Sequence, residues 1–357
     1  MRVRTVALLV LATAARPQDL TPPPDRYDAD RAEAVRRGLD YLARTQRRDG
    51  SWGDPERGVI GITALGVLAF LAQGNQEGLG PYSDFPGQGD VVRRAVDFLL
   101  EHSTATPRRG RPAGFIFAEN DADSRMHGHG YATQALVLIY GIGRADAARE
   151  RELKEKIRLA IKVIEESQTI TGGWGYEPNQ ATLHEGSVTV TVVQALRVAS
   201  EAGFVVDREV QERGLRYLRD SQKYDGSFKY SHMAETSTPA LTAAALTAMH
   251  GFGEYYSRAV DKGLDYLERA YRRPHLVPWP FYSHYYAAQA FYRAQGAYWE
   301  LWQRVVIPHI LSEQNRAEGF WDDSTAPGSR EHGRHHATAY SVLALSVDEG
   351  CLPIFQR

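Results

Sequence analysis

The stretch "RRGLDYLARTQRRDGSWG", residues 36–53, joins a charged, amphipathic segment to a tight turn that carries a tryptophan. The same arrangement returns as "ERGLRYLRDSQKYDGSFK" at residues 212–229. Both copies keep their spacing across the segment and the turn, which indicates two copies of one structural unit. The positions identical in the two copies include Gly38, Leu39, Tyr41, Leu42, Gln46, Asp49, Gly50 and Ser51 of the first copy.

Four further segments complete a set of repeats. The turn glutamine returns as Gln168 and as Gln314, each followed by a glycine and an aromatic residue. The segments 95–103 and 263–271 keep the helical pattern without the glutamine. The sequence therefore predicts six units.

Each unit continues into a second segment of different character. Examples are 58–74, "GVIGITALGVLAFLAQG", and 237–251, "STPALTAAALTAMHG", which are apolar or small nearly all round. The first segments, such as 31–45, have one apolar stripe and one charged face. A striped helix lies at a surface, whereas an apolar helix without a polar face is buried on every side. Each unit is thus predicted to be an outer helix, a turn and an inner helix.

Six such hairpins form either an open array or a closed ring. An open array needs polar capping helices at its ends, and the first unit shows none. We therefore predict an all-α fold, an α/α toroid with parallel inner helices inside a ring of outer helices. The expected organisation is a signal peptide at 1–14, a Pro-rich linker at 15–29 and one toroid domain at 30–357.

The signal peptide rests on Arg2 and Arg4, the apolar run that follows, and a small-residue cleavage site at residues 12–14. It predicts an exported protein, periplasmic or extracellular. Loss of the two arginines lowers the formal charge from -2 to -4. Acids and bases are mixed along the chain, so we expect no nucleic-acid partner. No later run is apolar enough for a membrane span, and the single Cys351 allows no internal disulfide.

The run from Arg37 and Gly38 through Tyr41 and Gln46 to Trp52 resembles the QW motif of squalene and other triterpene cyclases. These enzymes belong to the terpenoid cyclase and protein prenyltransferase α/α-toroid superfamily. The resemblance implies that the glutamine and the aromatic residue of each turn tie one outer helix to the next. The aromatic positions, which we expect to be scaffold, are Trp52, Trp174, Phe228 and Phe320.

The chemistry of that superfamily is not evident in the chain. The resemblance implies a DxDD acid at the start of an inner helix, but residues 127–132 read "HGHGYA" and 332–337 read "HGRHHA". The nearest acids, in "DADS" at 121–124, are interpreted as turn residues upstream of the helix. Protein prenyltransferases bind zinc partly through cysteine, and Cys351 lies after the last helix. No cofactor is predicted.

Histidines gather instead where the inner helices are expected to begin. In a closed ring these starts share one rim, so the side chains are predicted to meet at one mouth. Candidate catalytic residues, as general base or acid, are His129, His336 and Tyr131. Candidate ligand-binding residues are His127, His184, Glu185, His284, His332 and His335. Further aromatic residues for the walls are Tyr176, Tyr282, Tyr285 and Trp279.

Two other interpretations of these histidines stay open. They can cap helix ends or satisfy buried polar groups. A metal site of His127, His129, His332 and His336 is the lesser alternative, because no carboxylate at fixed spacing completes the set. Six parallel helices also direct their positive amino ends at the mouth, which favours an anion unless acids on the rim offset the field.

Three functions follow. The first is a toroid that binds an apolar or anionic ligand (a small molecule, lipid or saccharide) or a protein partner at the His-rich mouth. The second is an exported lyase or hydrolase acting on an acidic polysaccharide. The third is a divergent terpenoid cyclase that protonates its substrate with another group.

Overall fold

The structure is a computed structural model that describes residues 28–108, 110–143, 145–324, 326–327 and 332–355. Within these residues the chain forms helices and isolated β-bridges but no extended strand. The expected signal peptide and nearly all of the expected linker lie outside the described residues. The first helix begins at Asp28, two residues before the predicted start of the domain.

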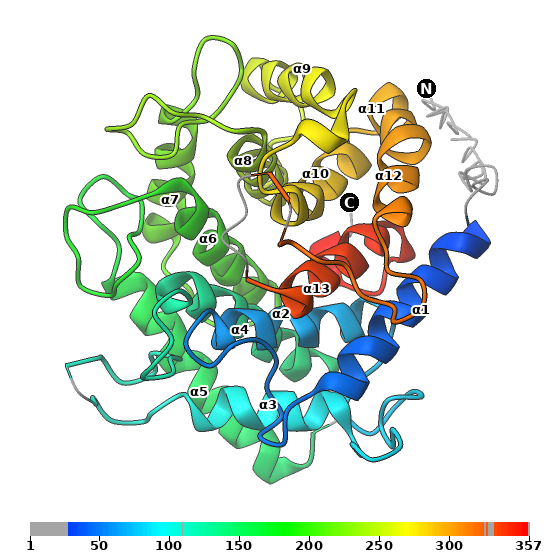
Figure 1. The fold of residues 1–357 in the computed structure, drawn as a ribbon. Coiled ribbons are helices and arrows are strands. Elements are labelled where there is room, and N and C mark those ends of the chain that lie inside the picture. The colour runs from blue at the N-terminus through cyan, green and yellow to red at the C-terminus, as the bar shows by residue number, and fades with distance from the viewer. Residues whose placement is uncertain (1–27, 109, 144, 325, 328–331, 356–357) are drawn as a thin grey trace, which may run out of the picture.

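Six of the described helices are inner helices. They form a ring that the other helices surround (Figure 1). The inner helices are α2 (Val59–Ala72), α4 (Arg125–Ile142), α6 (Gly186–Glu201), α8 (Pro239–Gly251), α10 (Pro280–Ala294) and α13 (Arg334–Leu345). The outer helices of the first five hairpins are α1 (Asp28–Thr45), α3 (Val91–Glu101), α5 (Ala147–Glu166), α7 (Arg208–Asp220) and α9 (Arg258–Tyr271). The predicted α/α toroid of six hairpins is confirmed.

The sixth outer segment is not one regular helix. It runs through α11 (Gly296–Leu301), a π-helical stretch η2 (Trp302–Val306) and α12 (Ile307–Ser312). Short 3-10 turns η1 (Pro274–Leu276), η3 (Val347–Glu349) and η4 (Pro353–Phe355) complete the described helices.

The ring closes where the last hairpin meets the first. Helix α13 packs against both α1 and α2, and α12 contacts α1. An ion pair joins Arg31 of α1 to Asp348 of η3, with 2.8 Å between Nη1 and Oδ2. The first hairpin therefore needs no capping helix, because the sixth covers its open face.

The repeated glutamine ties each turn to the next outer helix. Nε2 of Gln222 donates to the carbonyl of Gly226 in its own turn, at 3.2 Å, and to that of Ala259 in α9, at 2.8 Å. Gln46 and Gln168 make the equivalent bonds to α3 and α7. Gln314 makes them to its own turn and to Ala34 of α1, which closes the circle.

The turn aromatics fill the space between outer and inner helices. The indole N–H of Trp52 donates to the Leu42 carbonyl at 2.7 Å, and its backbone N–H donates to Oγ1 of Thr63 on the inner helix at 3.0 Å. In the sixth unit these two bonds come from Trp321. The prediction that Phe320 holds this position was wrong by one residue, because the turn after Gln314 is one residue longer.

The remaining aromatic positions behave as predicted. Trp174 and Phe228 are buried, and their backbone N–H groups donate to Thr189 and Thr242 of the inner helices. Phe320 packs instead against Tyr41, with ring centroids 5.3 Å apart.

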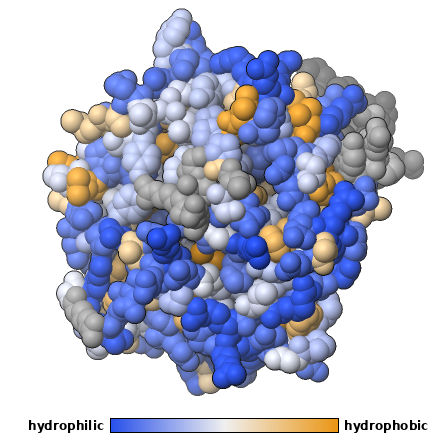
Figure 2. All heavy atoms as spheres, viewed as in Figure 1, coloured by the Kyte–Doolittle hydropathy of each residue, from blue (hydrophilic) through white to orange (hydrophobic). Residues whose placement is uncertain are grey.

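The face seen in Figure 2 is largely hydrophilic, with small, separate hydrophobic patches. In the described part of the chain no helix is both long and apolar enough to cross a membrane. The only cysteine, Cys351, is exposed after the last inner helix.

Candidate functional site

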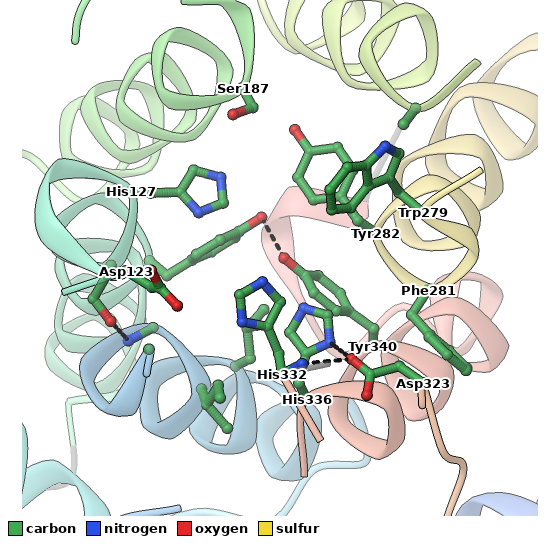
Figure 3. A pocket seen from close by; sticks show the side chains of 18 of the residues that line it. Asp123, His127, Ser187, Trp279, Phe281, Tyr282, Asp323, His332, His336 and Tyr340 are labelled. Carbon is green, nitrogen blue, oxygen red and sulfur yellow. Dashed lines mark hydrogen bonds and ion pairs between the residues drawn. The ribbon is translucent and has the colours of Figure 1, made fainter. Parts of the chain in front are cut away.

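A cavity of about 450 Å³ lies at the amino ends of the inner helices, and residues of all six contribute to its wall. The turns that connect outer to inner helices also reach it, through Tyr176, Tyr230 and Asp323. Figure 3 shows imidazole, phenol and carboxylate groups projecting into this space. The predicted convergence of the inner helices on one mouth is confirmed.

Equivalent positions on different helices face the cavity. The third residue of five inner helices lines it: Gly61, His127, Leu241, Tyr282 and His336. Three of these side chains are polar, on α4, α10 and α13. Because successive hairpins are related by a rotation about the ring axis, residues that are far apart in sequence lie at the same depth in the cavity wall.

His336 is paired with a buried carboxylate. Oδ2 of Asp323 lies 3.4 Å from Nδ1 of His336, and Asp323 is 1% exposed. The same carboxylate accepts the backbone N–H groups of His332 and Gly333, at 3.0 and 2.9 Å. Burial raises the pKa of Asp323, but the contact with His336 and the Gly333 N–H outweigh it, so the net pKa is lowered. Asp323 therefore stays ionised beside the imidazole.

His127 is a neutral group at physiological pH. Burial, together with the nearby imidazoles of His332 and His336, lowers the pKa of His127 to about 3. The His332 and His336 rings lie 4.8 Å apart, centroid to centroid. Three of the seven predicted histidines, His127, His332 and His336, thus meet in the wall of the cavity.

The predicted catalytic tyrosine belongs to the cavity. Tyr131 lines it, and its hydroxyl lies 2.8 Å from that of Tyr286 and accepts a hydrogen bond from Tyr340 at 2.9 Å. Burial and the neighbouring tyrosines raise the pKa of Tyr131 well above its ordinary value. Tyr176, Tyr282 and Trp279 also line the cavity as expected, whereas Tyr285 does not.

The acids of "DADS" lie nearer the site than predicted, because α4 begins at Arg125 and not at His127. Asp121 caps the neighbouring inner helix, where its carboxylate accepts the N–H groups of Gly58 and Ile60 at 2.7 and 3.1 Å. Asp123 lines the cavity, and its carboxylate has no hydrogen-bond or ion-pair partner among the described residues. Both acids precede α4 as predicted. Asp121 also accepts the N–H groups of Asp123 and Ser124, at 3.2 and 2.9 Å, and Asp123 lies within the turn while its side chain faces the cavity.

His129 was wrongly predicted as catalytic. Its Nδ1 accepts the backbone N–H of Ile116 at 3.1 Å, and its Nε2 donates to the carbonyl of Ala160 at 3.1 Å. This bond from the Ile116 N–H is equivalent to the one that Thr63 accepts from the backbone N–H of Trp52 in the first unit. The His129 side chain is fully buried and links the turn, α4 and α5 through these hydrogen bonds.

Three further histidines lie outside the cavity. His335 accepts the N–H of Gly53 at 3.3 Å and contacts Thr45, so it helps to close the ring. His284 is buried against Tyr271 and His309. His184 lies against Tyr217 of the outer helix. Their positions do not fit the predicted role of binding a ligand at the mouth.

Glu185, predicted as ligand-binding, is the N-cap of α6. Its side chain accepts the N–H groups of Ser187 and Val188, at 3.1 and 2.8 Å, and it is 3% exposed. Asp121, Glu185 and Asp323 thus place a carboxylate on the amino ends of three inner helices. The positive potential expected from six helix ends is offset at these three.

The alternative metal set does not assemble as predicted, since both ring nitrogens of His129 are engaged elsewhere. Among the described residues no group of three or more His, Cys, Asp or Glu side chains has the arrangement of a metal site.

Asp323 and Asp123 were not predicted as catalytic or ligand-binding residues, and Tyr282 was expected only as an aromatic residue of the wall. The sequence feature that could have identified Asp323 is its position two residues after the aromatic residue of the turn. Tyr176 and Tyr230 occupy this position in two other units, and both also line the cavity.

Comparison with protein-family models gives no match, and comparison with curated protein sequences gives none either. Solved structures of low sequence identity share the fold. A type II terpene cyclase, MstE from Scytonema, in complex with geranylgeranyl dihydroxybenzoate, matches with a TM-score of 0.57 and 16% identity, covering 91% of this chain and 98% of that one. A protein from Actinoplanes matches with a TM-score of 0.58 and 18% identity, covering 88% and 98%.

The GH76A α-1,6-mannanase from Salegentibacter sp. HEL1_6 matches with a TM-score of 0.60 and 9% identity, covering 90% of this chain and all of that one. At such identities the likeness concerns the fold alone. The chain therefore has the α/α-toroid fold that type II terpene cyclases and the GH76 mannanase share.

Proposed function

We propose that the protein binds a small molecule or the end of a saccharide chain in the central cavity and acts on it by acid–base catalysis, as a lyase or hydrolase. The observation that carries the proposal is the Asp323–His336 pair in the cavity wall. A carboxylate at Nδ1 orients the imidazole and favours the tautomer whose Nε2 lone pair is free to accept a proton. His336 is the general base and Asp323 its positioning residue.

The acid partner in this proposal is Tyr131. Its raised pKa keeps the hydroxyl protonated, and hydrogen bonds to Tyr286 and Tyr340 provide a route through which the proton is replaced. A tyrosine hydroxyl and an imidazole in one cavity supply the two proton-transfer groups that β-elimination or hydrolysis needs.

The walls favour a substrate with both apolar faces and oxygen functions. Trp279, Phe281 and Tyr282 offer ring surfaces, and imidazoles and Asp123 offer hydrogen-bonding groups. The mannanase of the same fold has been captured, as an inactive variant, with α-1,6-mannotriose, which supports a saccharide here. Export through the predicted signal peptide would bring the protein to extracellular polysaccharides.

The test is a substrate screen followed by a double-mutant cycle. Uronic-acid polymers and α-1,6-mannan are incubated with the protein, and new unsaturated or reducing ends are measured. Wild type is expected to release one or the other. His336→Gln should lower kcat by about 100-fold or more, and Asp323→Asn should also lower it.

The double variant should be no slower than His336→Gln alone, because both residues serve one proton transfer. If the reductions in kcat of the two single variants multiplied in the double variant, or if His336→Gln kept full activity, the pair would not be the base. A screen without any product would count against the whole proposal.

A second function, terpenoid cyclisation, is favoured by one observation. Asp123 places an unpaired carboxyl group in an aromatic-rich cavity at the start of an inner helix, where the resemblance to class II cyclases calls for an acid. Incubation with squalene or a geranylgeranylated phenol and analysis of the products test it. Cyclised product that disappears in Asp123→Asn would establish this function, and unchanged substrate would exclude it for those compounds.

A further inference from the structure

Three polar atoms of the cavity residues are buried without a hydrogen-bond partner among the described residues. One of them, Nδ1 of His336, lies 3.4 Å from the Asp323 carboxylate. The other two, Nε2 of His127 and the hydroxyl oxygen of Tyr282, have no such neighbour. The hydroxyls of Tyr131 and Tyr340, which also line the cavity, are bonded to each other, and that of Tyr131 is bonded to Tyr286 behind the wall. A buried polar group without a partner costs about 1–3 kcal/mol, so two at one site call for an explanation.

The two groups face one another across the cavity. His127 is the third residue of α4 and Tyr282 the third residue of α10, and Figure 3 shows them projecting from opposite walls. Their ring centroids are 6.1 Å apart and the planes differ by 29°. The His127 ring also stands edge-on to Tyr131, at 5.1 Å, which fixes its orientation.

A non-glycine residue in the left-handed region starts each of the two helices that carry these groups, whereas glycines hold that conformation before α2 and α13. Arg125 and Trp279, at the starts of α4 and α10, have φ values of 44° and 54°, in the left-handed region that L-residues rarely adopt. Neither helix receives a side-chain cap at its start. Such backbone strain costs about 1–3 kcal/mol per residue and is concentrated at ligand-binding and active sites.

The chemistry of the pair selects the ligand group. His127 is neutral, so it offers no charge to an anion, and the carboxylates of Asp123 and Asp323 in the same wall disfavour one. A hydroxyl group both donates and accepts a hydrogen bond, so it can satisfy an imidazole nitrogen and a phenol together.

We propose that His127 and Tyr282 form a subsite that binds a neutral hydroxyl group of the ligand. The inference deepens the proposed small-molecule function of the cavity and rests on it. It excludes a purely hydrocarbon ligand and makes the hydroxyl the anchor that places the substrate beside His336. A sugar and an alcohol or phenol on an apolar skeleton both carry this group.

The test compares phenol with toluene, which differ by one hydroxyl in place of a methyl group. Calorimetric titration of wild type is expected to show phenol bound about tenfold more tightly than toluene, as one or two good hydrogen bonds imply. Tyr282→Phe and His127→Phe should each reduce this preference to about twofold or less. Tyr230→Phe is the matched control, because the Tyr230 hydroxyl is already bonded to that of Tyr176 at 2.8 Å, and it should keep the preference.

Equal binding of phenol and toluene to wild type, no binding of phenol, or a preference that survives both variants overturns the subsite. A third titration, with α-1,6-mannotriose, distinguishes between the two kinds of ligand that could carry the hydroxyl group. A phenol preference with mannotriose binding indicates a saccharide, and a phenol preference without it indicates an apolar alcohol or phenol. Either result supports the subsite.

Two further measurements separate this inference from the proposed reaction. Asp323→Asn should keep the preference for phenol even though its turnover falls. Phenol binding can therefore test the subsite even if the catalytic proposal fails. Stability gives an independent check. Tyr282→Phe should not lower the midpoint of thermal unfolding, whereas Tyr271→Phe, whose hydroxyl lies 2.8 Å from that of Ser283, should lower it. A clear loss of stability in Tyr282→Phe would show that its hydroxyl is engaged within the protein.

Discussion

Two histidines on the first turns of α4 show how position on one helix separates a cavity-lining group from a structural group. His127 and His129 are two residues apart, so their side chains point about 200° away from each other. His127 faces the cavity, whereas His129 faces α5 and accepts a turn N–H in the place that threonine takes in four other units. Two histidines only about half a helical turn apart thus have different roles.

This assignment predicts unequal effects of alanine substitution on stability. His129→Ala leaves the Ile116 N–H and the Ala160 carbonyl buried without partners, so the free energy of unfolding should fall by about 2–4 kcal/mol. His127→Ala removes a group without a hydrogen bond at Nε2 and should cost less than about 1 kcal/mol. Urea denaturation of both variants at neutral pH measures the difference. Equal losses would show that the two histidines are not distinguished in this way.

At the scale of the elements, the turn glycine sets how closely successive outer helices approach. Gly226 has φ of 93°, and a Cβ added there would lie 2.1 Å from the backbone oxygen of Lys262 in α9. Gly253 also has a positive φ, of 83°, but open space around it. An alanine at position 226 would therefore suffer both backbone strain and a steric clash, whereas an alanine at position 253 would suffer backbone strain alone.

Alanine at these two glycines separates the two costs. Gly253→Ala should lower the free energy of unfolding by about 1–2 kcal/mol, the cost of a left-handed conformation for an L-residue. Gly226→Ala should lower it by at least about 3 kcal/mol, because α7 and α9 must also move apart. Thermal or chemical denaturation of both variants provides the comparison. Similar losses at the two positions would mean that the turn does not pack on the next outer helix.

The hairpins were predictable from sequence because their two helices differ in pattern. The charged face of α1 and the all-round apolarity of α2 assign one to the surface and the other to the interior. The glutamine turns were predictable because Gln46, Gln168, Gln222 and Gln314 recur at fixed spacing. The one-residue error at Phe320 arose because the longer turn after Gln314 shifts the aromatic position without changing the pattern.

The site was less predictable for a physical reason. An inner helix that is buried on every side has no apolar stripe, so its sequence does not tell which side chains face the ring axis. His335 and His336 are adjacent, yet one contacts Gly53 and Thr45 of the first hairpin and the other lines the cavity. Asp121 and Asp323 cap helices through contacts that depend on the placement of neighbouring turns.

At the scale of the whole molecule, closure of the ring and the character of the cavity are linked. Neutral histidines from several hairpins, buried or half-buried, support the closed structure. Burial lowers their pKa values to about 3 or 4, compared with about 6.5 in an unfolded chain. They are His127, His129, His250, His284 and His335.

This arrangement predicts a protein that is labile in acid. Between about pH 6.5 and 4 the unfolded chain binds more protons than the folded one, so the free energy of unfolding falls as the pH is lowered. Each histidine contributes at most about 1.4 kcal/mol per pH unit, and Glu185, whose pKa burial raises, offsets part of the sum. Urea denaturation at about pH 7.5, 6.5 and 5.5 should show a loss of several kcal/mol. A constant free energy over this range would contradict the burial of these imidazoles.

The most direct test of the account is the distance in solution between α1 and the turn that follows α12. Arg44 of α1 donates to the backbone oxygen of Glu318 at 2.9 Å, so spin labels at these positions, in a Cys351→Ser background, report whether the ring is closed. A closed toroid predicts a single label-to-label distance below about 20 Å, since adjacent helices pack about 10 Å apart. An open array of six hairpins stacked at that spacing would give about 50 Å, and such a distance would contradict both the toroid and the cavity on which the proposed function rests.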